Sequence, residues 1–236
     1  MNTTRQMSSA TTVRTPTCAS MRLLMTGGTG VVGRALAPLA RAAGHELIAP
    51  ASRELDLFAP VAVARAVRGV DAVLHLATRI QPLEQLGKPE AWRDNDRLRA
   101  DASRILVDAA LGAGAAAYVQ PTVTFVYPAE GPVSEDTPIT DVAPILRSAL
   151  TAEREAERFA HSGRRGIVLR LGLLDGPGTG HKAPVPALGA TLHVADAARA
   201  VLAALTLPSG IYNVCRDGER VSNSRFTQAA GWHPSH

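Results

Sequence analysis

A short segment near the start of the chain, RLLMTGGTGVVGR at residues 22–34, constrains the fold more than any other. Its apolar residues 23–25 predict a buried strand, and the Ala- and Leu-rich residues after it predict a helix. A strand, a glycine-rich turn and a helix in this order open a dinucleotide-binding βαβ unit. Gly27 allows the tight turn, Gly30 lets the backbone approach a pyrophosphate, and Gly33 lets the helix pack close to the strand.

The start of this helix is the predicted site of the cofactor phosphates. The first N–H groups of a helix have no partner inside the helix and carry partial positive charge, so they bind anions. We therefore expect the turn and the first helical residues to contact a dinucleotide. These residues are Gly27, Thr29, Gly30, Val31, Val32 and Gly33.

Length and composition limit the class of protein. The chain has 236 residues, of which 46% are hydrophobic, which suffices for one α/β domain with a full core. It has neither an apolar run of about 18 residues nor a basic stripe with interleaved aromatic residues, so we expect neither membrane nor nucleic acid as a partner. We expect no metal site. Its two cysteines, Cys18 and Cys215, predict no disulfide framework and favour a reducing cytoplasm.

The order of the elements predicts the fold class. Residues 1–20 contain no acidic residue and no periodicity, so we interpret them as a disordered tail, with a transit peptide as the alternative. Residues 21–236 read as one domain, a doubly wound parallel sheet with helices on both faces. After the first strand, at residues 23–25, we expect strands at 46–49, 70–77, 116–119, 166–171 and 211–214. The expected helices are 31–43, bent or interrupted at Pro38, then 60–68, 92–111, 148–161 and one beginning within 192–200.

The residues after the second strand bear on the choice of coenzyme. NAD-preferring sites usually place an acidic residue there to bind the ribose 2′-OH, whereas this chain has Pro50-Ala-Ser-Arg53. Ser52 and Arg53 suit a 2′-phosphate, so the sequence favours NADP over NAD; an ordinary solvated charge is the alternative for Arg53. Asp56, with Leu57 beside it, is a candidate for the adenine amino group, and its alternative is the N-cap of the next helix.

The end of the third strand is a second candidate contact. Leu76, Ala77 and Thr78 would lie over the crevice in which ligands bind to open α/β sheets. His75 lies inside the apolar part of the same strand, and we interpret it as a core residue rather than a catalytic one.

Together these landmarks resemble the short-chain dehydrogenase/reductase superfamily, and most closely its extended branch, the NAD(P)-dependent epimerase/dehydratase family. The resemblance covers about residues 21–233. Its motifs are TGGTGVVG at 26–33, DAVLHLA at 71–77, WRDN at 92–95, FVYP at 125–128, EDTP at 135–138, LRLG at 169–172 with GPG at 176–178, HVAD at 193–196 and YNV at 212–214. The resemblance implies a Rossmann-type fold, bound NADP or NAD, cofactor contacts from Asn95, Thr122 and Leu173, and a homodimer formed through two helices.

The chain departs from this family at the catalytic residues. Members of the family that this chain resembles use a Ser or Thr together with Tyr-x-x-x-Lys. In that pair the tyrosine is the general acid/base, and the lysine lowers the pKa of the tyrosine. The residues four positions after the three tyrosines are Thr122, Gly131 and Arg216, so the chain contains no Tyr-x-x-x-Lys. Where the pair should fall, the sequence has Ile145 and Ala149.

Three candidate catalytic residues remain. Thr122 would supply the hydroxyl that binds a substrate carbonyl, although a shift of one residue would select Val123 instead. Tyr127 and Lys182, the latter next to His181, are candidates to polarise the substrate oxygen or relay a proton. The alternatives are a packing role for Tyr127 and simple solvent exposure for the two loop residues.

A second departure concerns the substrate-binding part. Only residues 179–192 separate the GPG and HVAD motifs, where the family usually has several dozen residues, so we expect a reduced C-terminal substrate lobe and a small, cyclic or hydrophobic substrate. The first hypothesis is an atypical NAD(P)H-dependent oxidoreductase that transfers hydride to a carbonyl, as a ketoreductase does. The alternatives are a non-catalytic NADP-binding sensor or interaction protein and a nucleotide-sugar epimerase or dehydratase.

Overall fold

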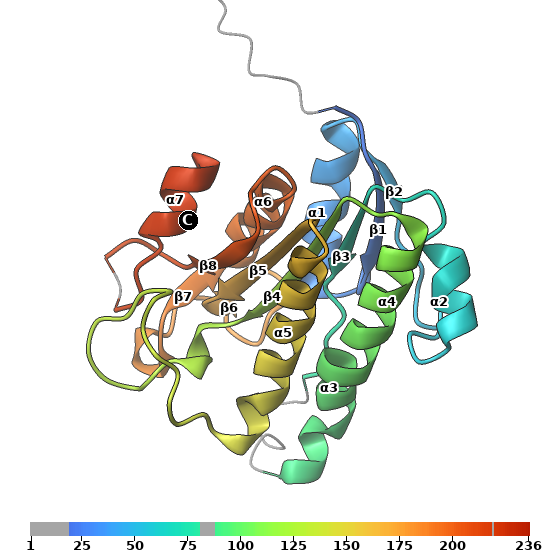
Figure 1. Ribbon diagram of the computed structural model, residues 1–236. Helices are drawn as coiled ribbons and strands as arrows, with labels where there is room; N and C mark the ends of the chain where they lie inside the picture. The colour runs from blue at the N-terminus through green and yellow to red at the C-terminus, as the bar shows by residue number, and fades with distance from the viewer. Residues whose placement is uncertain (1–18, 81–87, 219) are drawn as a thin grey trace, which may run out of the picture.

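The computed structural model describes residues 19–80, 88–218 and 220–236, so most of the predicted tail lies outside the described residues. Its main sheet has six parallel strands in the order β2-β1-β3-β4-β5-β8 (Figure 1). The strands are β1 (Arg22–Thr26), β2 (Glu46–Ile48), β3 (Ala72–His75), β4 (Ala117–Val123), β5 (Arg165–Leu171) and β8 (Gly210–Val214). The direction in which strands are added reverses between β1 and β3, which confirms the predicted doubly wound sheet.

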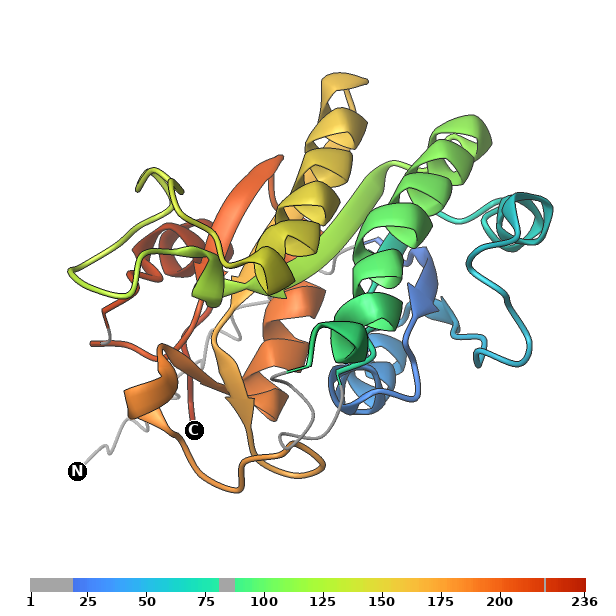
Figure 2. The same cartoon turned by 90° about the horizontal axis from the view of Figure 1, so that it is seen from below.

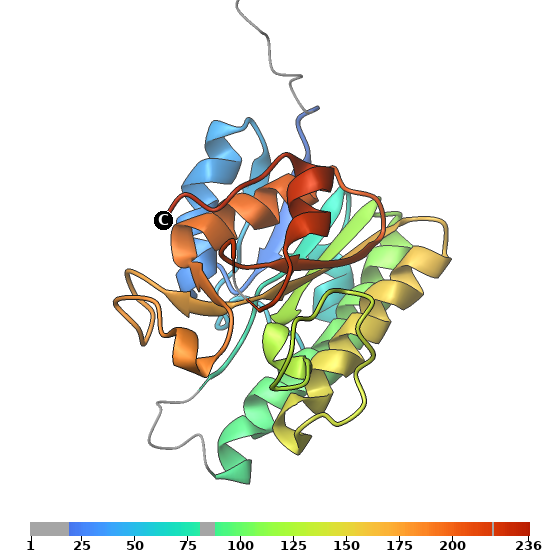
Figure 3. The same cartoon turned by 90° about the vertical axis from the view of Figure 1, so that its left-hand side faces the viewer.

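Helices cover both faces of this sheet (Figures 2 and 3). Along β1, Leu23 and Met25 pack into the core under one layer of helices and Leu24 packs into the core under the other. The first layer consists of α1 (Val31–Ala42), α6 (Val194–Ala204) and α7 (Ser224–Ala230). The second consists of α2 (Pro60–Ala66), α4 (Ser103–Ala113) and α5 (Arg147–His161). Because both faces are buried, the central strands β1 and β3 consist mainly of apolar residues without a polar alternation.

The helix predicted over residues 92–111 is interrupted. A 3-10 turn (Pro89–Trp92) leads into α3 (Arg93–Arg97), a π-helical segment (Leu98–Ala102) follows, and α4 then begins. The carbonyl of Leu98 accepts hydrogen bonds from His75 Nε2 at 3.1 Å and from Ser103 Oγ at 3.5 Å. These tertiary bonds compete with the regular helical pattern, and segments of this kind are frequent at functional sites.

Two further predictions about the elements differ from the structure. Of the two alternatives for Pro38, a bend or an interruption, the interruption is wrong: α1 continues through Pro38, and Leu36 and Ala40 on either side of it are fully buried. The second strand ends at Ile48 rather than at Ala49. The other predicted strands and helices are present with small shifts of their ends.

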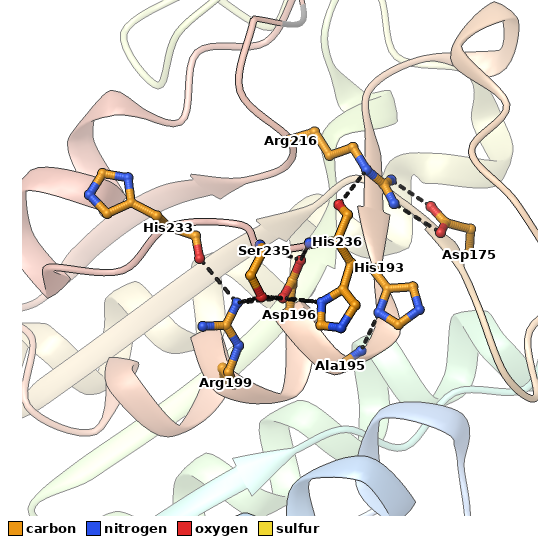
Figure 4. Close-up of polar contacts among 9 residues, drawn as sticks. All are labelled: Asp175, His193, Ala195, Asp196, Arg199, Arg216, His233, Ser235 and His236. Atoms are coloured by element: carbon orange, nitrogen blue, oxygen red, sulfur yellow. Dashed lines mark hydrogen bonds and ion pairs between the residues drawn. The ribbon is translucent and has the colours of Figure 1, made fainter.

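The C-terminal part adds a two-stranded sheet of β6 (Leu173–Asp175) and β7 (Thr191–His193). Figure 4 shows the contacts that fix its surroundings. Asp175 forms an ion pair with Arg216 at 2.6 Å, and the fully buried Asp196 accepts hydrogen bonds from the backbone N–H groups of Ser235 and His236. Burial opposes ionisation of Asp196, but bonds from Arg199, His236 and Ser235 outweigh it and hold the pKa of this carboxyl well below its ordinary value. These contacts hold residues 232–236 against α6.

Candidate functional site

The glycine-rich turn forms a close contact between β1, β3 and α1. Gly27 has φ of +72°, and a Cβ atom there would lie 2.5 Å from the backbone carbon of Leu76 at the end of β3. A Cβ atom at Gly33 would lie 2.3 Å from the Gly27 carbonyl oxygen. The Gly30 N–H donates to the same carbonyl at 2.9 Å. Only glycine fits at Gly27 and Gly33, as the sequence motif predicts.

The start of α1 is open to an anionic ligand. Its N-cap is Gly30, which is extended and has no side chain to bond the first N–H groups of the helix. Arg34 donates a hydrogen bond to the Thr29 carbonyl, which places a cation beside the turn. A Cβ atom at Gly178 would lie 3.0 Å from Arg34 Nη2, so the GPG loop lies over the start of α1. Sequence analysis did not single out Arg34, although its place in the first helical turn was a usable signal.

A cavity of about 470 Å³ adjoins this turn at the switch point between β1 and β3. Ligands of open α/β sheets bind at such points, outside the carboxyl ends of the strands. Eight of the predicted cofactor residues line it: Gly27, Thr29, Gly30, Asp56, Leu57, Leu76, Ala77 and Thr78. The structure therefore brings together residues from three separate stretches of the sequence at one cavity.

The far end of this cavity differs from the sequence expectation. Ser52 lines the cavity, but the Arg53 side chain is 85% exposed and lies 3.8 Å from Glu54. Asp56 Oδ1 accepts a hydrogen bond from the Phe58 N–H at 2.9 Å, and α2 is preceded by Ala59, so the alternative of an N-cap is wrong for Asp56. A cation that sequence analysis missed, Arg97, lines the cavity and lies over the Phe58 ring, 4.2 Å from its centroid.

His75 lies beneath the cavity as a buried, neutral side chain. Its Nε2 donates to the Leu98 carbonyl, so its Nδ1 accepts from the Thr26 hydroxyl at 2.6 Å. Burial lowers the pKa of His75 to about 4, against a smaller opposing effect of the Leu98 carbonyl. The interpretation of His75 as a core residue is confirmed.

This histidine should make the protein less stable as the pH falls. Between pH 6.5 and 4 the unfolded chain binds a proton at His75 and the folded protein does not, so stability is lost as the pH decreases through this window. We expect a loss of about 2 to 3 kcal/mol in the free energy of unfolding from this residue between about pH 7.5 and 4.5. Urea unfolding of the wild type and of His75→Gln at both pH values measures it. An equal loss in the two proteins would contradict the prediction.

A buried hydrogen-bond network lies below the carboxyl end of β4. Glu153 on α5 accepts from the Thr122 hydroxyl at 2.8 Å and binds Arg170 Nε and Nη2 at 2.9 and 2.6 Å. Arg170 Nη1 donates to the Tyr127 oxygen at 2.8 Å, and the Tyr127 hydroxyl donates to Asn213 Oδ1 at 2.8 Å. The five side chains thus form one continuous chain of bonds across β4, α5, β5 and β8.

Of the three candidate catalytic residues, Thr122 and Tyr127 belong to this network and Lys182 does not. Thr122 is 3% exposed and its hydroxyl is engaged by Glu153, while Val123 is half-buried. The Tyr127 hydroxyl donates its hydrogen bond to Asn213. Burial raises the pKa of Tyr127, and the neighbouring Arg170 has the opposite, smaller effect. Lys182 is exposed on the loop between β6 and β7.

A second cavity, of about 570 Å³, lies outside the carboxyl end of β4. Three segments line it: Thr124, Phe125, Tyr127 and Ala129; Pro186, Ala187, Gly189 and Ala190; and Gly218 with Arg220. Tyr127 joins this cavity to the buried network. Its size is typical of small-molecule sites.

The remaining predicted residues line neither cavity. Asn95 is fully buried and its Oδ1 accepts from the Arg79 N–H at 3.1 Å. Leu173 is half-buried in β6. Ile145, where sequence analysis expects the family's tyrosine, lies in the 3-10 turn before α5 and is 36% exposed, and Ala149, at the expected lysine position, is fully buried on α5.

Comparison with known proteins identifies the family. The model of the NAD dependent epimerase/dehydratase family matches residues 23–188. The chain belongs to this family. A Streptomyces member named 3-diazoavenalumate denitrifying reductase is 36% identical over 221 residues, which cover 78% of this chain and 72% of that protein.

Solved structures show the same fold at lower identity. RMD from Pseudomonas aeruginosa, complexed with NADPH, is 22% identical with a TM-score of 0.75 over 92% of this chain and 94% of that one. A short-chain dehydrogenase/reductase superfamily protein from Agrobacterium tumefaciens with bound NAD is 18% identical, with a TM-score of 0.76 over 91% and 93% of the two chains. The UDP-glucose 4-epimerase of Thermotoga maritima, with UDP-glucose, is 16% identical, with a TM-score of 0.74 over 91% and 94%.

Membrane-spanning helices and metal-binding clusters are both absent from the part of the chain that the structure describes. No helix within 19–80, 88–218 and 220–236 is long and apolar enough to cross a membrane. In the same residues no group of three or more His, Cys, Asp or Glu side chains is placed to hold a metal ion.

Proposed function

We propose that this family member is an NAD(P)H-dependent reductase that transfers hydride to a small aromatic diazo substrate. The observation that carries the proposal is that the sequence contains no Tyr-x-x-x-Lys while the glycine turn for the cofactor is kept. From the sequence, the family's pair is expected at Ile145, in the turn before α5, and at Ala149 on α5, and both have hydrocarbon side chains. A reaction that consumes hydride without needing an acid fits this combination better than carbonyl reduction does.

The cofactor that fits is NADP, with NAD as the alternative. The turn that only glycine can form, the open N-terminus of α1 and the adjoining cavity of about 470 Å³ suit the pyrophosphate and adenosine of a dinucleotide. Structural neighbours that were solved with NADPH or NAD support this assignment. When bound, the reduced coenzyme supplies the hydride.

The coenzyme preference predicts the effect of one substitution. Ser52 lines the first cavity, and the exposed side chain of the next residue, Arg53, is proposed to turn toward the 2′-phosphate of a bound coenzyme. Arg53→Ala should then weaken NADPH binding roughly tenfold and change NADH binding little, because a charge-assisted hydrogen bond to that phosphate is lost. Fluorescence titration with both coenzymes measures the effect, and Arg65→Ala on α2 is the control. Equal losses for the two coenzymes would exclude Arg53 from recognition of the 2′-phosphate.

The number of protons that the reaction consumes favours a diazo substrate over a carbonyl. Reduction of a carbonyl consumes one hydride and one proton, and the proton normally comes from a protein acid. Reductive loss of nitrogen from an aryl diazonium ion consumes one hydride only: the C–N bond breaks, N₂ leaves with its electron pair, and a C–H bond forms. The Streptomyces relative is named as a reductase that denitrifies a diazo acid, which supports the same chemistry here.

In this reaction the chain orients the substrate and excludes water. The second cavity lies outside β4 and is lined mainly by apolar residues, among them Phe125 and Pro186. The network from Thr122 through Glu153 and Arg170 to Tyr127 fixes the floor of that cavity. These side chains act as positioning residues and none donates a proton to the substrate.

Replacing the two hydroxyl groups should therefore change turnover only a few-fold. Tyr127→Phe and Thr122→Val each remove a hydroxyl that an acid-dependent reductase would need, and loss of a general acid costs about 10²- to 10⁴-fold. We expect kcat with a diazo substrate to fall by less than about tenfold in both variants. Steady-state rates at temperatures where circular dichroism shows the variants folded measure this. A loss of about 100-fold or more would assign the hydroxyl to catalysis.

The proposal is tested with 4-carboxybenzenediazonium and NADPH. Oxidation of NADPH, release of N₂ and formation of benzoate should occur in equal amounts and faster than in the absence of protein. Aromatic and cyclic ketones form the comparison series. Turnover of ketones but not of the diazonium ion would favour a ketoreductase, and NADPH binding without turnover of either would favour a sensor.

A further inference from the structure

Arg220 is the charged residue of the second cavity. Among the described residues that line this cavity, the others are apolar or glycine apart from Thr124 and Tyr127. The hydroxyl of Tyr127 is already bonded to Asn213 and its oxygen to Arg170. The wall thus offers a ligand one full positive charge, at Arg220.

The backbone holds Arg220 in a fixed position. Val221 pairs with Val133 in an isolated bridge, in which the Val133 N–H donates to the Arg220 carbonyl at 3.0 Å and the Ser222 N–H donates to the Val133 carbonyl at 2.9 Å. Val221 is buried in a small apolar cluster with Val133 and Tyr127. Arg220 lines the second cavity together with Tyr127 and Ala190, two members of this cluster.

A neutral acceptor anchors the guanidinium. Arg220 Nη1 donates to the Gly131 carbonyl at 3.0 Å, and within 19–80, 88–218 and 220–236 no ion pair of Arg220 with a carboxylate is found. A guanidinium has several more N–H groups in a planar fork, and that fork matches a carboxylate. The bond to Gly131 therefore orients the head group, and other N–H groups of the fork can bind a ligand.

The rest of the cavity is suited to an apolar, flat body. Phe125, Pro186, Ala187 and Ala190 contribute hydrocarbon surface. Gly189 has φ of +124°, and a Cβ atom there would lie 3.1 Å from the Phe125 ring, so the loop 186–190 lies directly against this ring. Aromatic side chains favour offset-stacked or edge-on contacts with other rings.

We propose that the second cavity binds an aromatic monocarboxylate, and that Arg220 is the specificity-determining residue that binds its carboxylate. This inference rests on the proposed function and narrows its substrate class. A charged hydrogen bond to one guanidinium suits one carboxylate. A nucleoside diphosphate, as in the sugar nucleotides of several structural neighbours, carries more negative charge than the described wall of this cavity can match.

The test compares cinnamate with cinnamamide, which has the same shape and no charge. With the full chain saturated with NADP⁺, calorimetry should show that cinnamate binds about tenfold more tightly than the amide, as expected for one charge-assisted bond. Arg220→Met should abolish this difference, and Arg220→Lys should restore part of it. Arg154→Met, which removes an exposed cation on α5, is the matched control and should keep the full preference.

The outcomes separate this inference from the proposed function. Equal binding of the two ligands by the wild type, no binding of cinnamate, or an unchanged preference in Arg220→Met would each overturn the role of Arg220. In those cases NADPH titration and diazonium reduction still report on the reductase independently. If Arg220→Met does not fold, the wild-type preference and the Arg220→Lys variant still decide the question, because lysine keeps the charge but loses the planar fork.

Discussion

Replacing Gly33 with alanine should weaken NADPH binding roughly 10- to 100-fold. The added Cβ atom would lie 2.3 Å from the Gly27 carbonyl oxygen and 2.8 Å from the Gly28 Cα atom, and both are backbone atoms that no rotamer change can move. The start of α1 must therefore shift away from the turn. Such a shift displaces the open N–H groups that we assign to the pyrophosphate.

Gly112→Ala provides the matched control for this prediction. Gly112 lies within α4, has no atom within 4 Å of an added Cβ atom, and should gain slightly in stability because alanine favours a helix. Fluorescence titration with NADPH, together with the melting temperature of each variant, separates lost binding from lost fold. A Gly33→Ala protein with native affinity and native melting temperature would show that the turn does not hold the cofactor.

Replacing Arg170 with methionine should lower the free energy of unfolding by about 3 to 5 kcal/mol. Arg170 binds both oxygens of Glu153, which is only 6% exposed, and its loss leaves this buried carboxylate with the Thr122 hydroxyl as its hydrogen-bond partner in the network and with the charge of the buried Arg99 nearby. The same substitution removes the donor to the Tyr127 oxygen. Urea unfolding at neutral pH measures the loss.

A double variant tests the physical reason for this loss. If the unmatched charge of Glu153 causes the instability, Arg170→Met combined with Glu153→Leu should recover much of the lost stability, because an apolar pair of similar volume often replaces a buried ion pair without net cost. A double variant as unstable as the single one would show instead that the packing of Arg170 over the Tyr127 ring, 4.9 Å from its centroid, is the dominant contribution.

The parts of the fold that were predictable from the sequence depend on local patterns. The turn around Gly27 and Gly33 is set by backbone conformation and close approach, which glycine reports directly. Continuous apolar runs such as 23–25 predict strands that are covered on both faces. The family motifs then fix the order of the elements, and the cavity at the switch point follows from that order.

The parts that were not predictable depend on contacts between distant segments. The π-helical segment at Leu98 requires the contact with His75, which lies 23 residues earlier. The hydroxyl of Thr122 faces Glu153, 31 residues later, and no periodicity reveals that pairing. The second cavity likewise joins residues near Phe125 to Arg220, and no sequence pattern indicates that this arginine belongs to the site.

Transfer of deuterium from the coenzyme shows whether hydride reaches the diazo-bearing carbon. With NADPH that carries deuterium at both C4 positions, we expect the arene formed from 4-carboxybenzenediazonium to contain one deuterium on the carbon that bore nitrogen, with one N₂ released for each NADPH oxidised. Mass spectrometry of the product benzoate, together with its NMR spectrum, gives the result. Benzoate without deuterium, formed while the coenzyme is consumed, would contradict hydride transfer to the diazo substrate.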